Sequence, residues 1–212
     1  MRRILSLVIL LAILTGGDLL LRNIAEQQVA DQVKSEMPAN AHVSASIPVF
    51  PFVPRVVFWG SVPKVNVKVT NVQGPPLNLA EARVSISGVV VNRHHLLNKR
   101  RIELVSIDKG TVEAVVTQDA LSDVLHAPVK ITGGTVSLTV AGQSVTVKPS
   151  IDKANHLVLT PVGPGGEART VGLGQANLVP CAGSVSVEEG KVRVSCSFTH
   201  IPDSFVRAAN GK

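Results

Sequence analysis

The stretch VNVKVT at residues 65–70 carries a valine at every second position and a polar residue at each position between. Successive side chains of a β-strand point to opposite faces of the sheet, so this pattern predicts a strand with one apolar and one polar face. The stretch RVSIS at residues 83–87 alternates in the same way. Further short alternating stretches lie between residues 129 and 198, and several are joined by glycine-containing turns. We therefore expect a long antiparallel sheet with one apolar face.

Two helices are expected beside these strands. Residues 18–37 carry apolar residues at every fourth position and end before Pro38, which predicts an amphipathic helix. Residues 118–126 follow Thr117, a residue type that often caps helices, and predict a short second helix. The stretch DKG at residues 108–110 separates two alternating stretches and predicts a hairpin turn. The predicted fold class is α+β, with a curved antiparallel sheet wrapped around two or three helices.

The composition narrows the class of protein. Of the 212 residues, 45% are hydrophobic and only 3% are aromatic, and the formal net charge is +6. This is enough apolar material for one buried domain, which we assign to residues 23–212. Aromatic side chains are too few to fill the apolar face of a long sheet, so either helices or a lipid chain must cover it. A lipid groove on this face would be lined by Val65, Val67, Val69, Val84 and Ile86.

The N-terminal residues indicate the cellular location of the protein. Two arginines precede an apolar run from residue 4 to residue 14, and three further leucines end at Arg22. Residues 1–22 therefore have the pattern of a cleaved signal peptide, and they are also long enough for a retained signal anchor. Both alternatives carry the following domain across the membrane. The expected location is the cell envelope, on the outer side of the cytoplasmic membrane, with the domain anchored, periplasmic or secreted.

Four of the six aromatic residues gather in residues 47–60, together with three prolines. The prolines predict a stiff, non-helical segment. One interpretation is an apolar lip that contacts a bilayer, because tryptophan is frequent at membrane interfaces. The other is a plug that fills one end of the core. The four aromatic residues are Phe50, Phe52, Phe58 and Trp59.

A run of basic residues lies at 93–101, between two predicted strands. Its cations are suited to an anionic phospholipid head group or to the membrane surface, and the alternative is an ordinary solvated loop. No aromatic residues interleave the run, so we expect no nucleic-acid partner. The candidate head-group residues are Arg93, Lys99, Arg100 and Arg101.

The sequence has no recognisable catalytic or metal-binding motif. It contains no GxSxG, HExxH or P-loop pattern. His94 and His95 are adjacent, and on an extended segment they would point to opposite faces. We therefore expect a binding protein without catalytic residues, bound metal or cofactor.

Two cysteines bracket the last predicted hairpin. Cys181 and Cys196 lie on either side of a turn at residues 188–190, nearly opposite each other. In an exported protein this arrangement predicts a disulfide bond. Two free thiols are the alternative.

The residues around the aromatic segment resemble a known family. A helix that leads into residues 43–47, then Phe50-Pro51-Phe52, Gly60 and the valines of residues 65–69, is similar to the actinobacterial LmeA-like phospholipid-binding family, formerly a domain of unknown function. The helix after Thr117 and the stretch LVP at residues 178–180 extend the resemblance over most of the chain.

This resemblance implies a fold similar to tubular lipid-binding domains and a phospholipid ligand, for which we expect an anionic lipid. Members of the family are linked to cell-envelope lipids and to lipomannan elongation. The resemblance thus implies an exported or anchored protein that supports envelope lipid or lipoglycan synthesis. A second function stays open: a non-catalytic structural or interaction domain of the envelope, with a filled core and no ligand.

Overall fold

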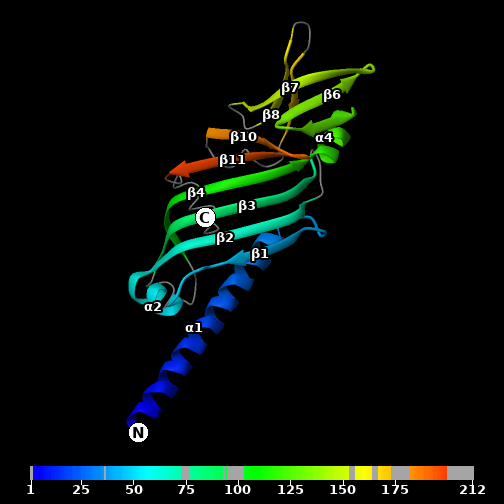
Figure 1. Cartoon of the computed structure of the whole chain (residues 1–212). Coiled ribbons are helices and arrows are strands. Elements are labelled where there is room, and N and C mark those ends of the chain that lie inside the picture. The colour runs from blue at the N-terminus through cyan, green and yellow to red at the C-terminus, as the bar shows by residue number, and fades with distance from the viewer. Residues whose placement is uncertain are drawn as a thin grey trace.

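The computed structural model describes residues 2–35, 37–72, 77–92, 94, 103–152, 156–163, 167–172 and 182–199. These residues form a six-stranded large sheet, a five-stranded small sheet and helices, all connected as an α+β fold (Figure 1). The predicted fold class is confirmed. The sequence predicted one long sheet, whereas the structure has two, because the chain leaves the large sheet after β4 and returns to it only at β10.

The large sheet has the strand order β1-β2-β3-β4-β11-β10, and its neighbouring strands are antiparallel. The C-terminal hairpin predicted from the sequence is present as β10 and β11, and β11 pairs with β4. The strand bounds are β1 His42–Ser46, β2 Ser61–Val72, β3 Leu79–Val91, β4 Leu104–Thr117, β10 Ala182–Glu188 and β11 Lys191–Thr199.

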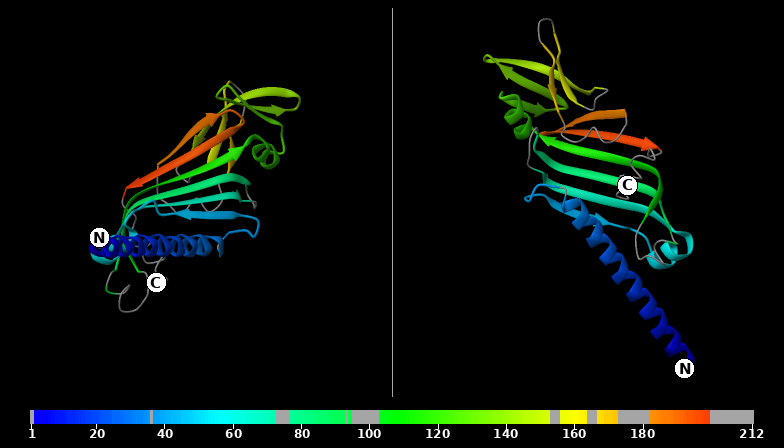
Figure 2. Two further views of the ribbon diagram at one scale, coloured as in Figure 1. Left: turned by 60° about the horizontal axis from the view of Figure 1, so that its bottom comes forward. Right: turned by 180° about the vertical axis from the view of Figure 1, so that it is seen from behind.

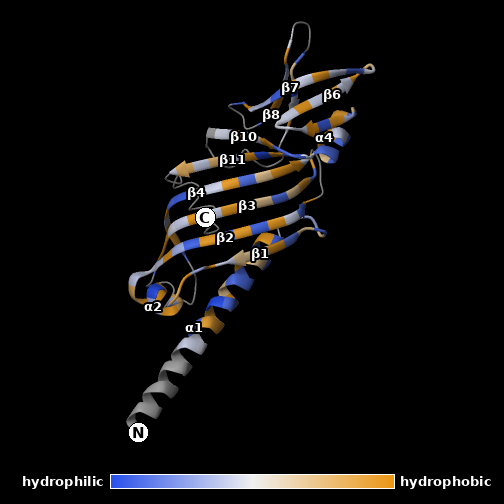
Figure 3. Ribbon diagram, viewed as in Figure 1, coloured by the Kyte–Doolittle hydropathy of each residue, from blue (hydrophilic) through white to orange (hydrophobic). Residues whose placement is uncertain are grey.

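The strand register aligns the alternating residues across the large sheet. Val67 lies opposite Val84, Val84 opposite Val112, and Val112 opposite Cys196. One residue further along β2, Lys68 lies opposite Arg83 and so belongs to the other face. Figure 3 shows this alternation as bands of opposite hydropathy along β2, β3 and β4. The large sheet therefore has one apolar and one polar face.

The small sheet stands at the edge of the large sheet opposite to helix α1 (Figures 1 and 2). It is preceded by helix α4, Gln118–Leu125, whose N-cap Thr117 accepts a hydrogen bond from the Ala120 N–H at 3.3 Å, as predicted. Leu121, Val116 and Val192 are fully buried between α4 and the two sheets. The strands of the small sheet are β5 Val129–Thr132, β6 Thr135–Val140, β7 Gln143–Ile151, β8 Leu157–Pro161 and β9 Arg169–Val171.

Hydrogen bonds fix the small sheet to the end of the large one. The Gln118 N–H donates to the Gly190 carbonyl at 3.0 Å, and the Gly190 N–H donates to the Ile131 carbonyl at 3.2 Å. Gln118 Oε1 accepts from the Ile131 N–H at 3.0 Å, and Glu189 Oε2 accepts from the Gly133 N–H at 3.1 Å. The β10–β11 turn, α4 and β5 are thus joined at one point.

Helix α1, Arg2–Ser35, runs along the β1 edge of the large sheet and continues beyond it towards the N-terminus (Figures 1 and 2). Val29 and Val33 pack on a buried core formed by Ala41, Val67 and Val69. The helix predicted at residues 18–37 is therefore confirmed, and it begins earlier than predicted. Within the described residues, no helix combines the length and the apolar character that crossing a membrane requires.

The turn predicted at residues 108–110 is wrong, because β4 runs without interruption from Leu104 to Thr117. Gly110 lies within β4, opposite Phe198 of β11. A Cβ atom on Gly110 would lie only 2.2 Å from Cζ of Phe198. The glycine therefore makes room for an aromatic ring from the neighbouring strand and does not form a turn.

Candidate functional site

The middle of the apolar face is less buried than its two sides. Ala82 and Val84 of β3 lie opposite Ala114 and Val112 of β4, and all four residues are half-buried. We call these four residues the central strip. On one side the strip adjoins the core under α1, and on the other it adjoins the core of the small sheet, which includes Val194. The strip is the part of the apolar face that lies between two buried cores.

The positions around the strip carry no charge. On β4, the register assigns Gly110 and Val116 to the same face as the strip, and both are buried. Opposite them, β11 contributes Phe198, Cys196, Val194 and Val192. An apolar chain is the ligand that matches such a surface, because a polar group placed there would lose its water without gaining a hydrogen-bond partner.

The predicted groove residues share this face. Val65 lies opposite Ile86, and Val67 lies opposite Val84. Val67 and Val69 are buried under α1, whereas Val65, Val84 and Ile86 are half-buried. The structure thus brings the five residues together and places Val84 in the central strip. Their role in binding a lipid stays a prediction.

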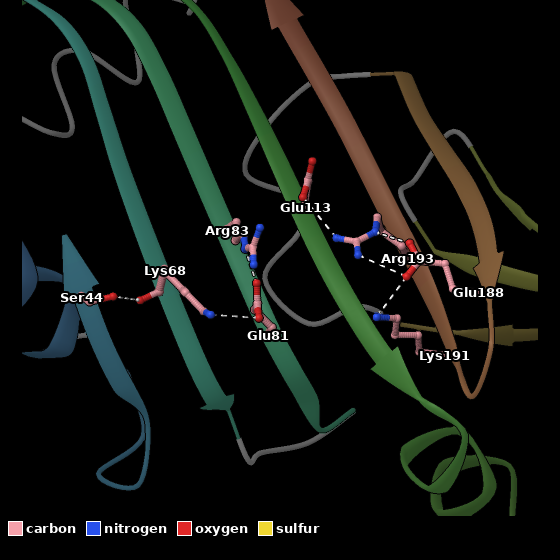
Figure 4. Close-up of polar contacts among 8 residues, drawn as sticks. All are labelled: Ser44, Lys68, Glu81, Arg83, Glu113, Glu188, Lys191 and Arg193. Atoms are coloured by element: carbon pink, nitrogen blue, oxygen red, sulfur yellow. Dashed lines mark hydrogen bonds and ion pairs between the residues drawn. The ribbon is translucent and has the colours of Figure 1, made fainter. Parts of the chain in front are cut away.

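Ion pairs gather on the opposite, polar face of the large sheet (Figure 4). Glu81 pairs with Lys68, whose Nζ lies 3.2 Å from Oε2, and also with Arg83. Partial burial raises the pKa of Glu81, but the hydrogen bonds from Lys68 and Arg83 outweigh this effect and leave the pKa below its usual value. These charges face away from the central strip.

A second set of ion pairs lies at the β10–β11 hairpin (Figure 4). Arg193 Nε donates to Glu188 Oε1 at 2.7 Å, and Lys191 Nζ lies 3.0 Å from Glu188 Oε2. Hydrogen bonds from Arg193 and then Lys191 lower the pKa of Glu188 to about 2. Arg193 also reaches Glu113 of β4, with Nη1 at 3.4 Å from Oε2. The polar face therefore carries paired charges on β2, β3, β4, β10 and β11.

The aromatic segment folds into two helical turns, α2 Phe52–Pro54 and η1 Arg55–Trp59, so the predicted non-helical segment is wrong. Pro51 precedes the first turn and Pro54 lies within it. The first N–H groups of a helix have no partner inside the helix, so a proline there loses no hydrogen bond. The position of the prolines explains why they do not prevent the turn.

Asp18 of α1 caps this turn from a different helix. Its Oδ2 accepts a hydrogen bond from the Phe52 N–H at 2.8 Å, and its Oδ1 accepts one from the Val53 N–H at 2.5 Å. Asp18 is only 5% exposed. In the sequence, this residue lies within the predicted export segment at residues 1–22. Its role was missed because its hydrogen-bond partners lie 34 and 35 positions away along the chain.

The four aromatic residues of this segment divide into two groups. Phe52 is half-buried and packs on a core that includes Ile47. Phe50 is 61% exposed, and Phe58 and Trp59 are each 66% exposed. The rings of Phe58 and Trp59 meet edge to face, with their centroids 6.0 Å apart. We call Phe50, Phe58 and Trp59 the exposed lip.

Two predicted sites lie outside the described residues. They are the head-group residues Arg93, Lys99, Arg100 and Arg101, and the disulfide partner Cys181. Both sites stay predictions. Within the part of the chain that the structure describes, no group of three or more His, Cys, Asp or Glu side chains is placed to hold a metal ion.

A curved sheet with an apolar face, ion pairs on the other face and a helix along its edge defines a class of protein that can hold an apolar ligand. Comparison with family models gives the particular family. Residues 16–197 match the model described as LmeA-like phospholipid-binding, so the chain belongs to this family, and the resemblance found in the sequence is confirmed. No curated protein and no solved structure matches the chain.

Proposed function

We propose that the protein binds a phospholipid with the acyl chains on the central strip, and that it does so without catalysing a reaction. The observation that carries this proposal is the half-buried, uncharged strip formed by Ala82, Val84, Val112 and Ala114 between two buried cores. Covering apolar surface with an acyl chain is favourable by about 25 cal/mol for each Å² removed from water. Membership of a phospholipid-binding family supports this choice of ligand.

The pattern of residues 1–22 supports a place in the cell envelope, exported or membrane-anchored. There the protein supports the synthesis of envelope lipids or lipoglycans such as lipomannan. The head group extends beyond the apolar face. The basic run at residues 93–101 supports an anionic phospholipid as the ligand and the membrane surface as the place where it is bound.

The test is the lipid content of the purified full chain. Organic extraction followed by mass spectrometry should find phospholipid in near-stoichiometric amount. Replacing Ala82 or Ala114 by leucine fills the strip with side-chain volume, so both variants should retain several-fold less lipid. Thermal unfolding checks that each variant still folds.

The matched control is Thr111→Leu, which makes the same kind of enlargement on β4 but at an exposed position on the polar face. It should retain as much lipid as the unmodified chain. A folded chain that carries no phospholipid, even after incubation with vesicles, would contradict the proposal and favour a structural domain without a ligand. Equal retention by Ala114→Leu and Thr111→Leu would show that the strip is not the site.

A further inference from the structure

Three of the five aromatic side chains that the structure describes are exposed at one end of the molecule. The sequence has five phenylalanines, one tryptophan and no tyrosine, and Phe50, Phe58 and Trp59 are each more than 60% exposed. Leu21, three residues after Asp18 and therefore beside it on the surface of α1, is 47% exposed. Because Asp18 binds the first turn of α2, the apolar surface of α1 adjoins the exposed lip. Large apolar side chains gathered on a surface in this way indicate an interaction site.

The segment that carries the exposed lip is held in place by hydrogen bonds at both ends. At its start, the Asp18 carboxylate accepts the Phe52 and Val53 N–H groups. At its end, Gly60 adopts a left-handed conformation, its N–H donates to the Val56 carbonyl at 2.9 Å, and its carbonyl accepts from the Val91 N–H at 2.7 Å. A segment that is already ordered loses little conformational entropy when it binds a partner.

The exposed charges carried by the segment around the lip are positive, and the Asp18 carboxylate that contacts this segment is buried. From residue 37 to residue 80 the chain contains no aspartate or glutamate, whereas it contains Arg55, Lys64 and Lys68. Arg55 is exposed and lies in the same turn as Phe58 and Trp59. Aromatic side chains beside cations match the interface of a phospholipid bilayer, where rings enter the head-group region and cations meet phosphates.

We propose that the exposed lip docks on the surface of a phospholipid bilayer, with Arg55 facing the lipid phosphates and Asp18 holding the lip in its docking position. This inference rests on the proposed function, because docking brings the central strip to the membrane that supplies its lipid. It differs from the lip predicted from the sequence, because Phe52 packs inside and α1 contributes apolar surface at the same end.

Trp59 provides the test, because it is the only tryptophan and its fluorescence reports on the lip alone. The full chain is mixed with vesicles of phosphatidylcholine and phosphatidylglycerol, with and without acyl chains that carry bromine as a quencher. We expect the emission to move to shorter wavelength, and acrylamide quenching to fall roughly twofold or more as the ring leaves water. Brominated lipids should quench it. A Trp59 that stays equally open to acrylamide and is not quenched by brominated lipid overturns the proposal.

Paired variants separate the lip from the apolar N-terminal helix, which is the same in all of them. Phe50→Ser combined with Phe58→Ser should abolish quenching of Trp59 by brominated lipid. Val162→Ser changes a residue that is 64% exposed beside the small sheet, and it should leave the quenching unchanged. Equal effects of the two changes would contradict a specific lip.

The lipid content of the same preparations keeps the two proposals apart. A chain that docks but carries no phospholipid contradicts the proposed function alone. A chain that carries phospholipid while Trp59 remains in water contradicts the docking alone. Shielding of Trp59 from acrylamide before any vesicle is added would instead show that the lip is covered by a second copy of the chain, and would overturn the bilayer as its partner.

Discussion

The ring of Phe198 on β11 lies over Gly110 on β4, in the space that the Cβ atom of any other residue would occupy. Both residues are buried on the apolar face of the large sheet. We expect Gly110→Ala to destabilise the protein by about 1–3 kcal/mol, because the ring must move to admit the methyl group. Chemical denaturation of the full chain measures this loss.

The pair also predicts how the two positions are coupled. Phe198→Ala alone should cost about 3–5 kcal/mol through the cavity that it leaves. In the double variant the new methyl group of Gly110→Ala enters that cavity, so the combined loss should be smaller than the sum of the two single losses. Strict additivity would show that the ring does not rest on Gly110.

Asp18→Ala should loosen the aromatic segment. The change leaves the Phe52 and Val53 N–H groups without their acceptor, and each buried unpaired group costs about 1–3 kcal/mol. We expect a lower melting temperature, faster proteolysis between residues 47 and 60, and lower fluorescence anisotropy of Trp59. Asp18→Asn keeps one oxygen acceptor and should restore part of the loss.

Asp31→Ala is the control for this prediction, because it removes an exposed carboxylate from the same helix. If Asp18→Ala and Asp31→Ala gave the same melting temperature and the same Trp59 anisotropy, the contact between α1 and the aromatic segment would not hold the lip.

The features that the sequence predicted correctly are local in the chain. The alternation at residues 65–70 predicts β2, and Thr117 before an apolar run predicts α4. The features that it did not predict depend on partners far along the chain. The glycine in DKG predicts a turn, but Gly110 lies within a strand, where the absence of a side chain leaves room for the ring of Phe198. Asp18 reads as part of an export segment until its hydrogen bonds to Phe52 and Val53 are seen.

The division into two sheets was also beyond the sequence. Alternation predicts that a stretch is a strand and which of its residues share a face, but it does not name the neighbouring strand. The position of β11 between β4 and β10 follows from pairing over long distances in the chain. The central strip depends on that pairing, since Val194 of β11, a member of the small-sheet core, lies opposite Ala114.

Stability should depend on Glu188 at acid pH. Arg193 and Lys191 hold the pKa of its carboxyl at about 2, below the ordinary value of 4.5. A lower pKa in the folded state means that this contribution is complete above the unfolded pKa and is lost as the pH falls towards about 2. Glu188→Gln should therefore lose less stability than the unmodified chain when denaturation is repeated at decreasing pH.

The control for Glu188 is Glu167→Gln, at an exposed position just before β9. It should follow the unmodified chain at every pH. An NMR titration of Glu188 with a midpoint near the ordinary value for glutamate would contradict the ion pairs at the hairpin.

The basic run should set the preference for anionic lipid. Replacing Arg93, Lys99, Arg100 and Arg101 by glutamine removes four cations, each worth about 1 kcal/mol near an anionic surface. We expect weaker binding of the full chain to vesicles that contain phosphatidylglycerol, and a weaker dependence of this binding on salt, because salt screens exposed charges. Binding to neutral vesicles should not change. Equal losses on both kinds of vesicle would mean that the run is an ordinary solvated loop.

We expect Cys181 and Cys196 to form a disulfide bond in the cell envelope, the location proposed above. Cys196 lies on β11 opposite Gly183 of β10, and residue 181 comes two positions before Gly183 in the sequence. Closing a loop of about 15 residues would contribute about 3 kcal/mol in the chain-entropy account. Thiol labelling of the denatured, unreduced protein should find no free thiol. Cys181→Ser and Cys196→Ser should lower stability by similar amounts, and reducing agent should destabilise the unmodified chain but neither variant. Two labelled thiols in protein taken from the cell envelope would contradict the pairing.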